Sequence, residues 1–331
     1  MKIKVVRQPS VLIIAFIRKK NVIQLLECCA RNGVTKVYLA VDGPRNNEEI
    51  KIQNSLIAEA KAFSLSRKID LKLWHRSDNL GVAVGVISAI DWFFKYENKG
   101  VILEDDLEPS DQFFKFANEN LTKYELDQNI WVISGTQFFP ISEGKIDNQC
   151  SNYPIFWGWA TWSFKWAEMR KAFYFDVLNY GFIPNRKNLL QNYWKIGAKR
   201  CRLGVINTWD IPIAAFMWQK RKLCVMPTSN LITNIGSDSV ATHTNKSEWP
   251  LHMEKYENAL TMHEIEGSPQ FFAEINNYKL EKKVFKVKYY YFFLPIYGSL
   301  IDFLRKSKNK HNERLSIRIE AAVKIINSVQ T

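Results

Sequence analysis

The most informative part of the 331-residue sequence is Gly100-Val-Ile-Leu-Glu-Asp-Asp-Leu-Glu-Pro-Ser-Asp-Gln-Phe-Phe114. It begins with a short apolar run of strand length, Gly100 to Leu103, and Glu104-Asp105-Asp106 follows at once. Pro109-Ser110-Asp111 then favours the start of a helix. Ligand sites in open α/β sheets lie beyond the carboxyl ends of the strands. Three acids at such a strand end therefore call for a chemical explanation.

Strand and helix patterns alternate before this stretch. Apolar runs of strand length cover residues 11–17, 36–42 and 71–74, with helical spacing between them. A long apolar helix is predicted from about 82 to 96. Further on, strands are predicted at 130–134 and 224–227 and an apolar helix at 211–218. This order predicts an α/β fold with a mixed, mainly parallel sheet flanked by helices.

The composition is that of a folded protein, and the charge is concentrated near the C-terminus. The chain is 47% hydrophobic and has 46 Lys+Arg against 33 Asp+Glu, a net charge of +13. Residues 279–331 hold twelve basic and four acidic residues, so +8 of the +13 lies there. Basic clusters flank the aromatic run Tyr289 to Phe293, which suits an anionic membrane surface. The alternative is a solvated helix packed on the main domain.

Several function classes lose support because their motifs are missing. The five cysteines show no CxxC or Cys/His metal spacing and are predicted to be buried free thiols in a reducing compartment. No Walker A, GxGxxG, HExxH or GxSxG element is present.

The apolar runs at 11–17 and 289–301 are too short to span a bilayer. We expect a cytoplasmic protein that contacts the inner face of the plasma membrane peripherally.

The three acids at the strand end are suited to binding a hard divalent cation. Successive side chains on a strand point to opposite faces, so one carboxylate can ligate the ion while its neighbours bind hydroxyl groups. Magnesium or manganese held there would neutralise charge on a departing diphosphate. The alternative is a solvated acidic turn, but the apolar strand before and the helix after favour the metal site.

The same residues carry a resemblance to a known family. Residues 100–114 resemble the acidic strand-end motif of GT-A glycosyltransferases, most closely the N-acetylglucosaminyltransferase I-like group (glycosyltransferase family 13) and its bacterial relatives. In that motif Glu-Asp-Asp is followed by a hydrophobic and an acidic residue and then by a double Phe. The resemblance extends more weakly over residues 11–244, in the same order of elements.

The resemblance implies a Rossmann-like fold that binds a nucleotide-diphospho-sugar. We predict a GT-A domain over residues 1–275, with a nucleotide-sugar-binding half at 1–106 and an acceptor-side half at 107–275. The chain beyond Thr244 lies outside the resemblance, and we predict a basic, aromatic, helical extension at 276–331.

The family's motif also implies roles for single residues. Asp106 would be the direct ligand of Mn²⁺ or Mg²⁺, Asp105 a ribose partner and Glu104 a partner of donor-sugar hydroxyls. Arg18 would lie near the nucleotide, and Asp42 would read the base edge of uracil. The residues alone leave solvent exposure open for Arg18 and, for Asp42, a turn role.

Asn79 and Asp210 are the next candidates. Asn79-Leu80-Gly81 suits a turn before a helix N-terminus, where free N–H groups can meet an anion or a nucleotide. Trp209-Asp210 resembles the family's Trp-Asp-Asp element, whose acid is the catalytic base, but here only one acid is present. The alternative is that Asp210 caps the helix that contains Pro212. Both roles are compatible.

Aromatic residues and one histidine complete the set. Trp157-Gly158-Trp159 would present aromatic faces to a sugar ring, with Gly158 allowing close backbone approach. The alternative is core packing, because Phe156 to Trp166 also suits a partly buried helix. By the resemblance, His243 would approach the diphosphate or the metal, whereas a lone loop histidine is more often structural.

Together these features predict a metal-dependent, inverting glycosyltransferase. The donor would be a nucleotide-sugar, a UDP-sugar such as UDP-GlcNAc, and the acceptor a glycan or lipid-linked glycan of a bacterial surface polysaccharide. One alternative is a nucleic-acid-binding or processing protein, but most of the basic excess is far in sequence from the acidic strand end, so no nucleic acid is expected. Another is a catalytically inactive GT-A-like assembly protein.

Overall fold

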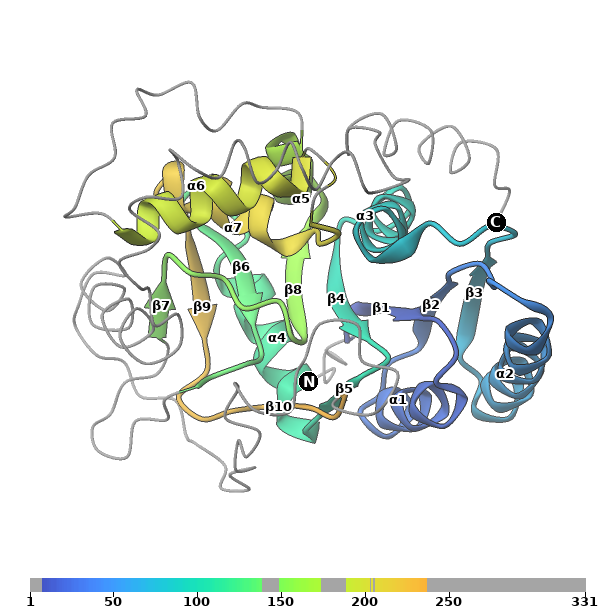
Figure 1. Ribbon diagram of the computed structural model, residues 1–331. Coiled ribbons are helices and arrows are strands. Elements are labelled where there is room, and N and C mark those ends of the chain that lie inside the picture. The colour runs from blue at the N-terminus through green and yellow to red at the C-terminus, as the bar shows by residue number, and fades with distance from the viewer. Residues whose placement is uncertain (1–7, 139–148, 174–188, 203, 205, 237–331) are drawn as a thin grey trace, which may run out of the picture.

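An eight-stranded sheet with helices on both faces forms the centre of the protein (Figure 1). The computed structural model describes residues 8–138, 149–173, 189–202, 204 and 206–236. His243 and the predicted extension at 276–331 lie outside the described residues, so the proposed domain division stays a prediction.

The first half of the chain builds the parallel part of the sheet. Strands β1, β2 and β4 pair in parallel around β1, and β3 adds to the outer edge of β2. Three helices connect them, as the alternation in the sequence predicts. The elements are β1 (Ser10–Ala15), α1 (Lys19–Arg31), β2 (Lys36–Val41), α2 (Asn47–Arg67), β3 (Asp70–His75), α3 (Gly81–Phe94) and β4 (Lys99–Glu104).

The second half adds the antiparallel pairs. The strand order is β3-β2-β1-β4-β8-β6-β9-β7, and β8 runs antiparallel to both β4 and β6. Strands β5 and β10 form a separate two-stranded sheet. The elements are β5 (Leu107–Pro109), α4 (Asp111–Lys123), β6 (Ile130–Ser134), β7 (Gln149–Ser151), β8 (Trp159–Trp162), α5 (Ser163–Met169), η1 (Arg170–Phe173), α6 (Leu189–Arg202), α7 (Asp210–Gln219), β9 (Leu223–Met226) and β10 (Ile232–Asn234). The predicted class, an α/β fold with a mixed and largely parallel sheet, is confirmed.

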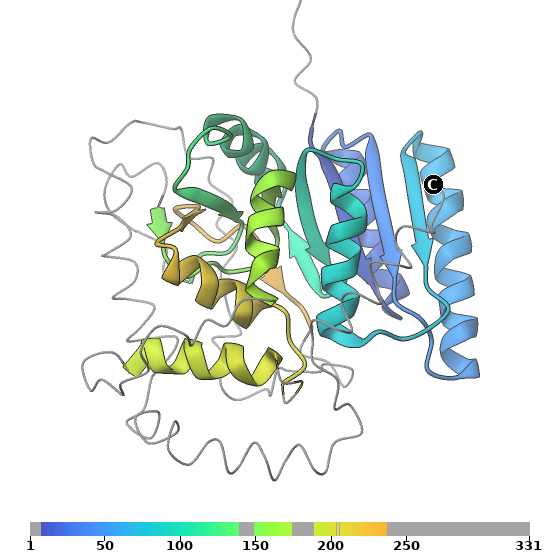
Figure 2. The same cartoon turned by 90° about the horizontal axis from the view of Figure 1, so that it is seen from above.

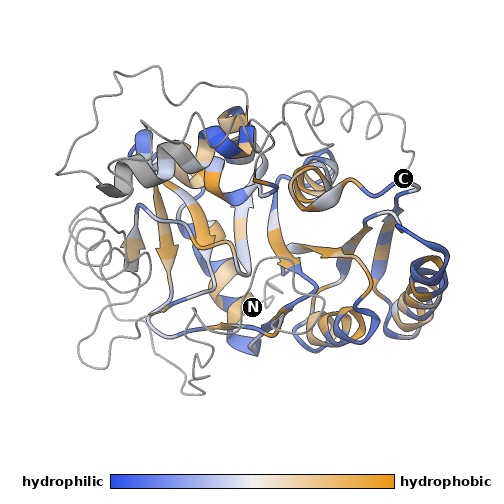
Figure 3. Ribbon diagram, viewed as in Figure 1, coloured by the Kyte–Doolittle hydropathy of each residue, from blue (hydrophilic) through white to orange (hydrophobic). Residues whose placement is uncertain are grey.

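Alternating strand residues divide the core into two layers. In β1, Leu12 and Ile14 face the layer that holds α3, α5 and α7, whereas Val11 and Ile13 face α1, α2 and α4. Figure 2 shows α3, α5 and α7 over one face of the sheet, with α6 against α7. The strands are mostly apolar and the outer side of α2 is hydrophilic (Figure 3). The continuous apolar runs therefore mark strands that are buried on both faces.

Two expectations about buried residues have clear outcomes. All five cysteines are buried free thiols, as predicted: Cys28, Cys29, Cys150, Cys201 and Cys224. The segment from Phe156 to Trp166, which also suited one partly buried helix, instead forms strand β8 followed by α5. The β-branched and aromatic residues of β8 pack between β4 and β6, and that tertiary context overrides the helical spacing.

Candidate functional site

A cavity of about 640 Å³ lies at the carboxyl ends of β1, β2 and β4. The sheet order changes direction at β1, because the chain reaches β2 on one side through α1 and β4 on the other side through α3. These two helices cover opposite faces of the sheet. Such a switch point leaves a crevice between the strand ends, which is where open α/β sheets bind ligands.

The structure brings most of the sequence-predicted residues together at this cavity. Of the nine that lie in the described part of the chain, eight line it: Arg18, Asp42, Asn79, Glu104, Asp105, Asp106, Trp157 and Asp210. Trp159 does not line it. The roles that the family resemblance implies for these residues stay predictions, since position alone does not show a ligand.

Asp105 ties the end of β1 to the end of β4. Its Oδ2 accepts a hydrogen bond from the Phe16 backbone N–H at 2.9 Å, and its Oδ1 accepts one from Arg18 Nη1 at 2.7 Å. Its backbone carbonyl accepts a third from Asn21 Nδ2 at 2.8 Å. Burial raises the pKa of Asp105, while Arg18 and the Phe16 amide act against that rise. Both carboxylate oxygens therefore serve the protein's own structure.

Three other carboxylates form the acidic wall of the cavity. Glu104 and Asp106 stand at the end of β4, and Asp210 arrives from the start of α7, more than a hundred positions later in the chain. Burial and the negative charges of Asp106, Asp210 and Asp105 raise the pKa of Glu104 well above its ordinary value. Carboxylates that raise the pKa of a neighbour in this way favour a nearby cation or a bound proton.

The loop that carries Asp106 is held by the end of β10. The Asp106 carbonyl accepts a hydrogen bond from the Ile235 N–H at 2.7 Å, next to the β5–β10 pairing. Gly236 packs so closely that a Cβ there would lie 2.7 Å from both Cβ and Oδ2 of Asp106. Only a residue without a side chain leaves the Asp106 carboxylate where it is.

Asp210 is the first residue of α7, and its carboxylate is anchored on one side. Its Oδ1 accepts hydrogen bonds from the Thr208 hydroxyl and from the Ile211 N–H, the latter at 2.9 Å. An acid in the first helical turn also interacts favourably with the helix dipole. The N-cap residue of α7 is Trp209, so Asp210 is not the capping residue that one alternative made it; it is the first helical residue and lines the cavity.

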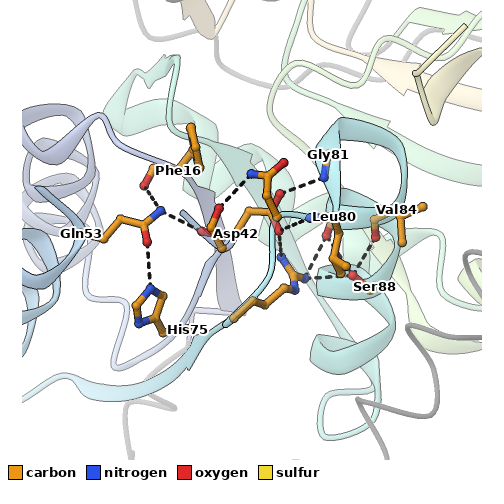
Figure 4. Close-up of polar contacts among 12 residues, drawn as sticks. Phe16, Asp42, Gln53, His75, Leu80, Gly81, Val84 and Ser88 are labelled. Atoms are coloured by element: carbon orange, nitrogen blue, oxygen red, sulfur yellow. Dashed lines mark hydrogen bonds and ion pairs between the residues drawn. The ribbon is translucent and has the colours of Figure 1, made fainter. Parts of the chain in front are cut away.

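At the other end of the cavity, Asp42 joins the end of β2 to the start of α3 (Figure 4). Its two oxygens accept hydrogen bonds from the Leu80 and Gly81 N–H groups, each at 3.1 Å. Arg76 Nη1 forms an ion pair with Asp42 Oδ1 at 3.5 Å. Burial raises the pKa of Asp42, and Arg76 and these N–H groups oppose the rise. Asn79 Nδ2 donates to the Gly43 carbonyl at 2.8 Å, which fastens the same turn.

Arg76 is a buried residue of this region that sequence reasoning missed. Its side chain is 3% exposed, its Nη2 donates to the Gly85 carbonyl and to Ser88 Oγ, each at 2.9 Å, and its guanidinium lies 4.1 Å from the Trp74 ring centroid. Burial lowers its pKa to about 10, and Asp42 opposes the fall, so Arg76 is charged at neutral pH. The one available signal was its position two residues after the predicted third strand.

Gln53 of α2 was also missed, and it connects the ends of three strands (Figure 4). Its Nε2 donates to the Phe16 carbonyl at 3.2 Å and to the Asp42 carbonyl at 2.8 Å. Its Oε1 lies 2.9 Å from His75 Nε2, so that nitrogen of His75 carries the proton. The Gln53 side chain is fully buried. A polar residue inside a helical pattern gives no sequence signal of such a role.

The aromatic residues separate into a cavity group and a core group. Trp157 lines the cavity and packs edge-to-face on Phe138, with ring centroids 5.7 Å apart. Trp159, expected beside a sugar, is 1% exposed and stacks on Trp209 in the core, with ring centroids 5.7 Å apart. It lies on β8, inside the sheet. The core-packing alternative therefore describes Trp159.

A glycine is required at position 158 for a different reason from the one expected. Its φ is +61°, and a Cβ there would lie 2.4 Å from Ile232 Cδ1. The close approach at this glycine is thus made by Ile232 of β10 and not by a ligand. The expectation that Gly158 allows a sugar to approach is corrected by this packing.

The chemistry of the acidic wall fits a hard divalent ion in a limited way. All its donors are carboxylate oxygens, which such ions prefer. Within the described residues, no group of three or more His, Cys, Asp and Glu side chains is arranged to hold a metal ion by itself. Magnesium usually binds through one or two carboxylates, water and substrate phosphates. Asp106 could be one such carboxylate ligand. The described residues do not form a complete set of protein ligands for a metal ion.

The strand order and the cavity define a Rossmann-like α/β fold with an acid-lined cavity at its topological switch point. None of the helices in the described ranges is long and apolar enough to cross a membrane.

Comparisons with known proteins add little to that description. No protein-family model matches the chain, and a search of curated proteins finds no match. Among solved structures, HddC from Yersinia pseudotuberculosis has 16% identity and a TM-score of 0.26, and the match covers 38% of this chain and 58% of that protein. UDP-glucose pyrophosphorylase in complex with UDP-glucose has 8% identity and a TM-score of 0.36, over 66% of this chain and 90% of that one. The fold assignment rests on the strand order.

Proposed function

We propose that this protein is a nucleotide-sugar-dependent glycosyltransferase of the GT-A type, similar to the N-acetylglucosaminyltransferase I-like group. The donor would be a UDP-sugar, with UDP-GlcNAc as the first candidate. The acceptor would be a hydroxyl of a glycan or lipid-linked glycan in bacterial surface polysaccharide synthesis. The observation that carries the proposal is the meeting of Asp210 with Glu104 and Asp106 at the switch point of the sheet.

In this proposal Asp210 is the general base. It takes the proton of the acceptor hydroxyl while the hydroxyl oxygen bonds to the anomeric carbon and the bond from that carbon to the diphosphate breaks. Attack on the face opposite the leaving group inverts the configuration. The hydrogen bonds from Thr208 and Ile211 fix Oδ1, so the carboxylate is oriented before the acceptor arrives.

The acids at the end of β4 would bind the nucleotide-sugar donor. A divalent ion such as Mn²⁺ or Mg²⁺ would supply positive charge that neutralises the departing diphosphate. Asp106 would hold that ion, and Glu104 would accept hydrogen bonds from sugar hydroxyls. Arg18, fixed by Asp105, would bring positive charge to the nucleotide side of the cavity.

The test measures UDP release and sugar transfer by the full-length protein with a panel of UDP-sugars and MnCl₂. We expect EDTA to abolish turnover and Asp210→Asn to lower it by at least about 100-fold while donor binding is kept, since general bases contribute factors of about 10² to 10⁴.

Glu108→Gln is the matched control, because Glu108 is an exposed acid on β5 that does not line the cavity. Its turnover should equal that of the wild type. An Asp210→Asn enzyme as fast as wild type would remove Asp210 from the mechanism. Donor binding with no turnover for any sugar would favour the inactive assembly protein.

The basic extension supports a second, separable proposal, that the protein docks on anionic membranes. Lys282, Lys283, Lys286 and Lys288 precede the aromatic run, and each basic residue near an anionic surface contributes about 1 kcal/mol. Changing all four to Gln in the full chain should sharply reduce flotation with phosphatidylserine vesicles. Unchanged flotation would contradict the membrane role and leave the transferase proposal intact.

A further inference from the structure

The start of α3 is capped by a residue from a distant part of the chain. The first N–H groups of a helix have no partner within the helix, and the side chain of the N-cap residue usually accepts from one of them. The N-cap of α3 is Leu80, which has no acceptor in its side chain and makes no such bond. Asn207 takes this role instead, because its Oδ1 accepts a hydrogen bond from the Ala83 N–H at 3.3 Å across 124 positions of sequence.

Asn207 lies three residues before Asp210, in the connection from α6 to α7, and both residues line the cavity. Between them, Trp209 is buried in the core, with its ring centroid 4.9 Å from that of Phe156. The hydrogen bond of Asn207 therefore ties the segment that leads into Asp210 to a helix from the first half of the chain.

The start of α3 is itself a fixed point of the site (Figure 4). The N–H groups of Leu80 and Gly81 donate to Asp42 at the end of β2, each at 3.1 Å. Through α3, the cap from Asn207 sets the position of Asp210 relative to the strand ends.

The exposure of Asn207 separates this role from a role in holding the fold together. The residue is exposed, so water can replace its hydrogen bond when the side chain is removed, and the net cost to stability is small. The loss would instead free the connection to shift against α3. Because catalysis depends on the position of reacting groups, a small shift of a general base lowers turnover strongly.

We propose that Asn207 is a positioning residue for Asp210. By capping α3 it holds the connection that carries Asp210 against the end of the cavity formed by β2 and α3, so the carboxylate is in place when the acceptor hydroxyl arrives. Asn207 itself takes no proton and touches no reacting atom. This inference rests on the proposed function, because it takes Asp210 as the general base.

The experiment is a double-mutant cycle on the full-length protein, with MnCl₂ and the most active UDP-sugar of the panel. We expect Asn207→Ala to lower kcat about 10-fold and to leave the KM of the donor nearly unchanged, because a shift of about 1 Å at a reacting group costs up to about 10²-fold. In the Asp210→Asn background the same substitution should change kcat less than about 2-fold, since residues that act as a unit are not additive.

Asn46→Ala is the matched control. Asn46 caps α2 by accepting from the Glu48 and Glu49 N–H groups at 3.1 and 2.9 Å, is exposed like Asn207 and does not line the cavity. Its loss should leave kcat unchanged. A second measurement needs no substrate: the solvent exchange rate of the Ala83 amide proton, followed by nuclear magnetic resonance, should rise several-fold in Asn207→Ala and stay the same in Asn46→Ala.

The outcomes separate this proposal from the transferase proposal. A loss of kcat that is present in the wild-type background and absent in Asp210→Asn supports the role of Asn207. An equal loss in both backgrounds, a similar loss in Asn46→Ala, no loss in Asn207→Ala, or an unchanged Ala83 exchange rate overturns that role and leaves the transferase proposal intact. An Asp210→Asn enzyme as fast as wild type, or no transfer with any UDP-sugar, overturns both.

Discussion

The two ends of the cavity use their polar side chains differently. At the end near β1, β2 and β3, the polar side chains bind backbone groups and basic residues of the protein itself. They are those of Asp105, Asp42 and Gln53. At the other end, Asp210 has one oxygen anchored and shares the acidic wall with Glu104. The first region fixes the shape of the site before any ligand binds, and the second holds the groups suited to chemistry.

The largest effect should come from breaking the first region. Asp105→Ala should lower the free energy of unfolding by about 3 kcal/mol, because it removes the buried acceptor of the Arg18 and Phe16 hydrogen bonds. Urea denaturation measures it. Asp111→Ala is the matched control, since Arg31 and Asp111 are also 2.7 Å apart but more than half exposed, and it should cost less than 1 kcal/mol. Equal losses would show that burial of the Asp105 pair is unimportant.

A middle-sized effect is expected at Gln53. Gln53→Leu should cost about 2 kcal/mol, because the Phe16 and Asp42 carbonyls lose their donor while buried. Asn54→Leu, an exposed site on the same helix, should leave stability within about 0.5 kcal/mol of wild type. A Gln53→Leu protein as stable as Asn54→Leu would mean that this region is not held by the Gln53 amide.

The buried cysteines outside the cavity make stability depend on pH. Burial raises the pKa of Cys28 to about 11 and that of Cys150 to about 12, from an ordinary value of 9.0. Since unfolding lowers these pKa values, each thiol's stabilisation is complete below pH 9 and is lost as pH rises towards the folded-state value, at up to about 1.4 kcal/mol per pH unit.

Urea denaturation at pH 8 and pH 10, with reductant, measures this loss. Cys28→Ala should show a smaller loss than wild type by about 1 kcal/mol. Identical pH dependence in the two proteins would contradict the assignment of this thiol.

The smallest effect is expected at the acidic wall. Gly236→Ala should weaken Mn²⁺ binding in the presence of UDP several-fold, because the new Cβ displaces the Asp106 carboxylate, a change of about 1 kcal/mol. Electron paramagnetic resonance of free Mn²⁺ measures it. Gly33→Ala, at a glycine outside the cavity, should leave Mn²⁺ binding unchanged. Unchanged Mn²⁺ binding by Gly236→Ala would indicate that Asp106 is not a ligand of the metal ion.

The sequence predicted the parallel half of the sheet well, because buried parallel strands are continuous apolar runs with helices between them. It also placed Glu104, Asp105 and Asp106 at a strand end, since strand ends follow from the same pattern. For Trp159 the sequence allowed either a sugar-facing side chain or a core side chain. Its burial on β8, between β4 and β6, decides for the core.

The site's partners could not be predicted in the same way. Arg76 and Gln53 act through contacts with residues of other elements, and no local spacing encodes those contacts. The approach of Asp210 to Glu104 likewise depends on how α7 is placed against the sheet.

The pairing of β5 with β10 has a consequence for the order of folding. It joins Leu107 to Asn234, a separation of 127 positions, so closing it costs more chain entropy than forming any of the early parallel pairs. A chain emerging from the ribosome can complete β1 to β4 long before Ile232–Asn234 is released. The parallel part of the sheet can therefore form early, and the loop that carries Asp106 reaches its final shape only after Asn234 has been synthesised.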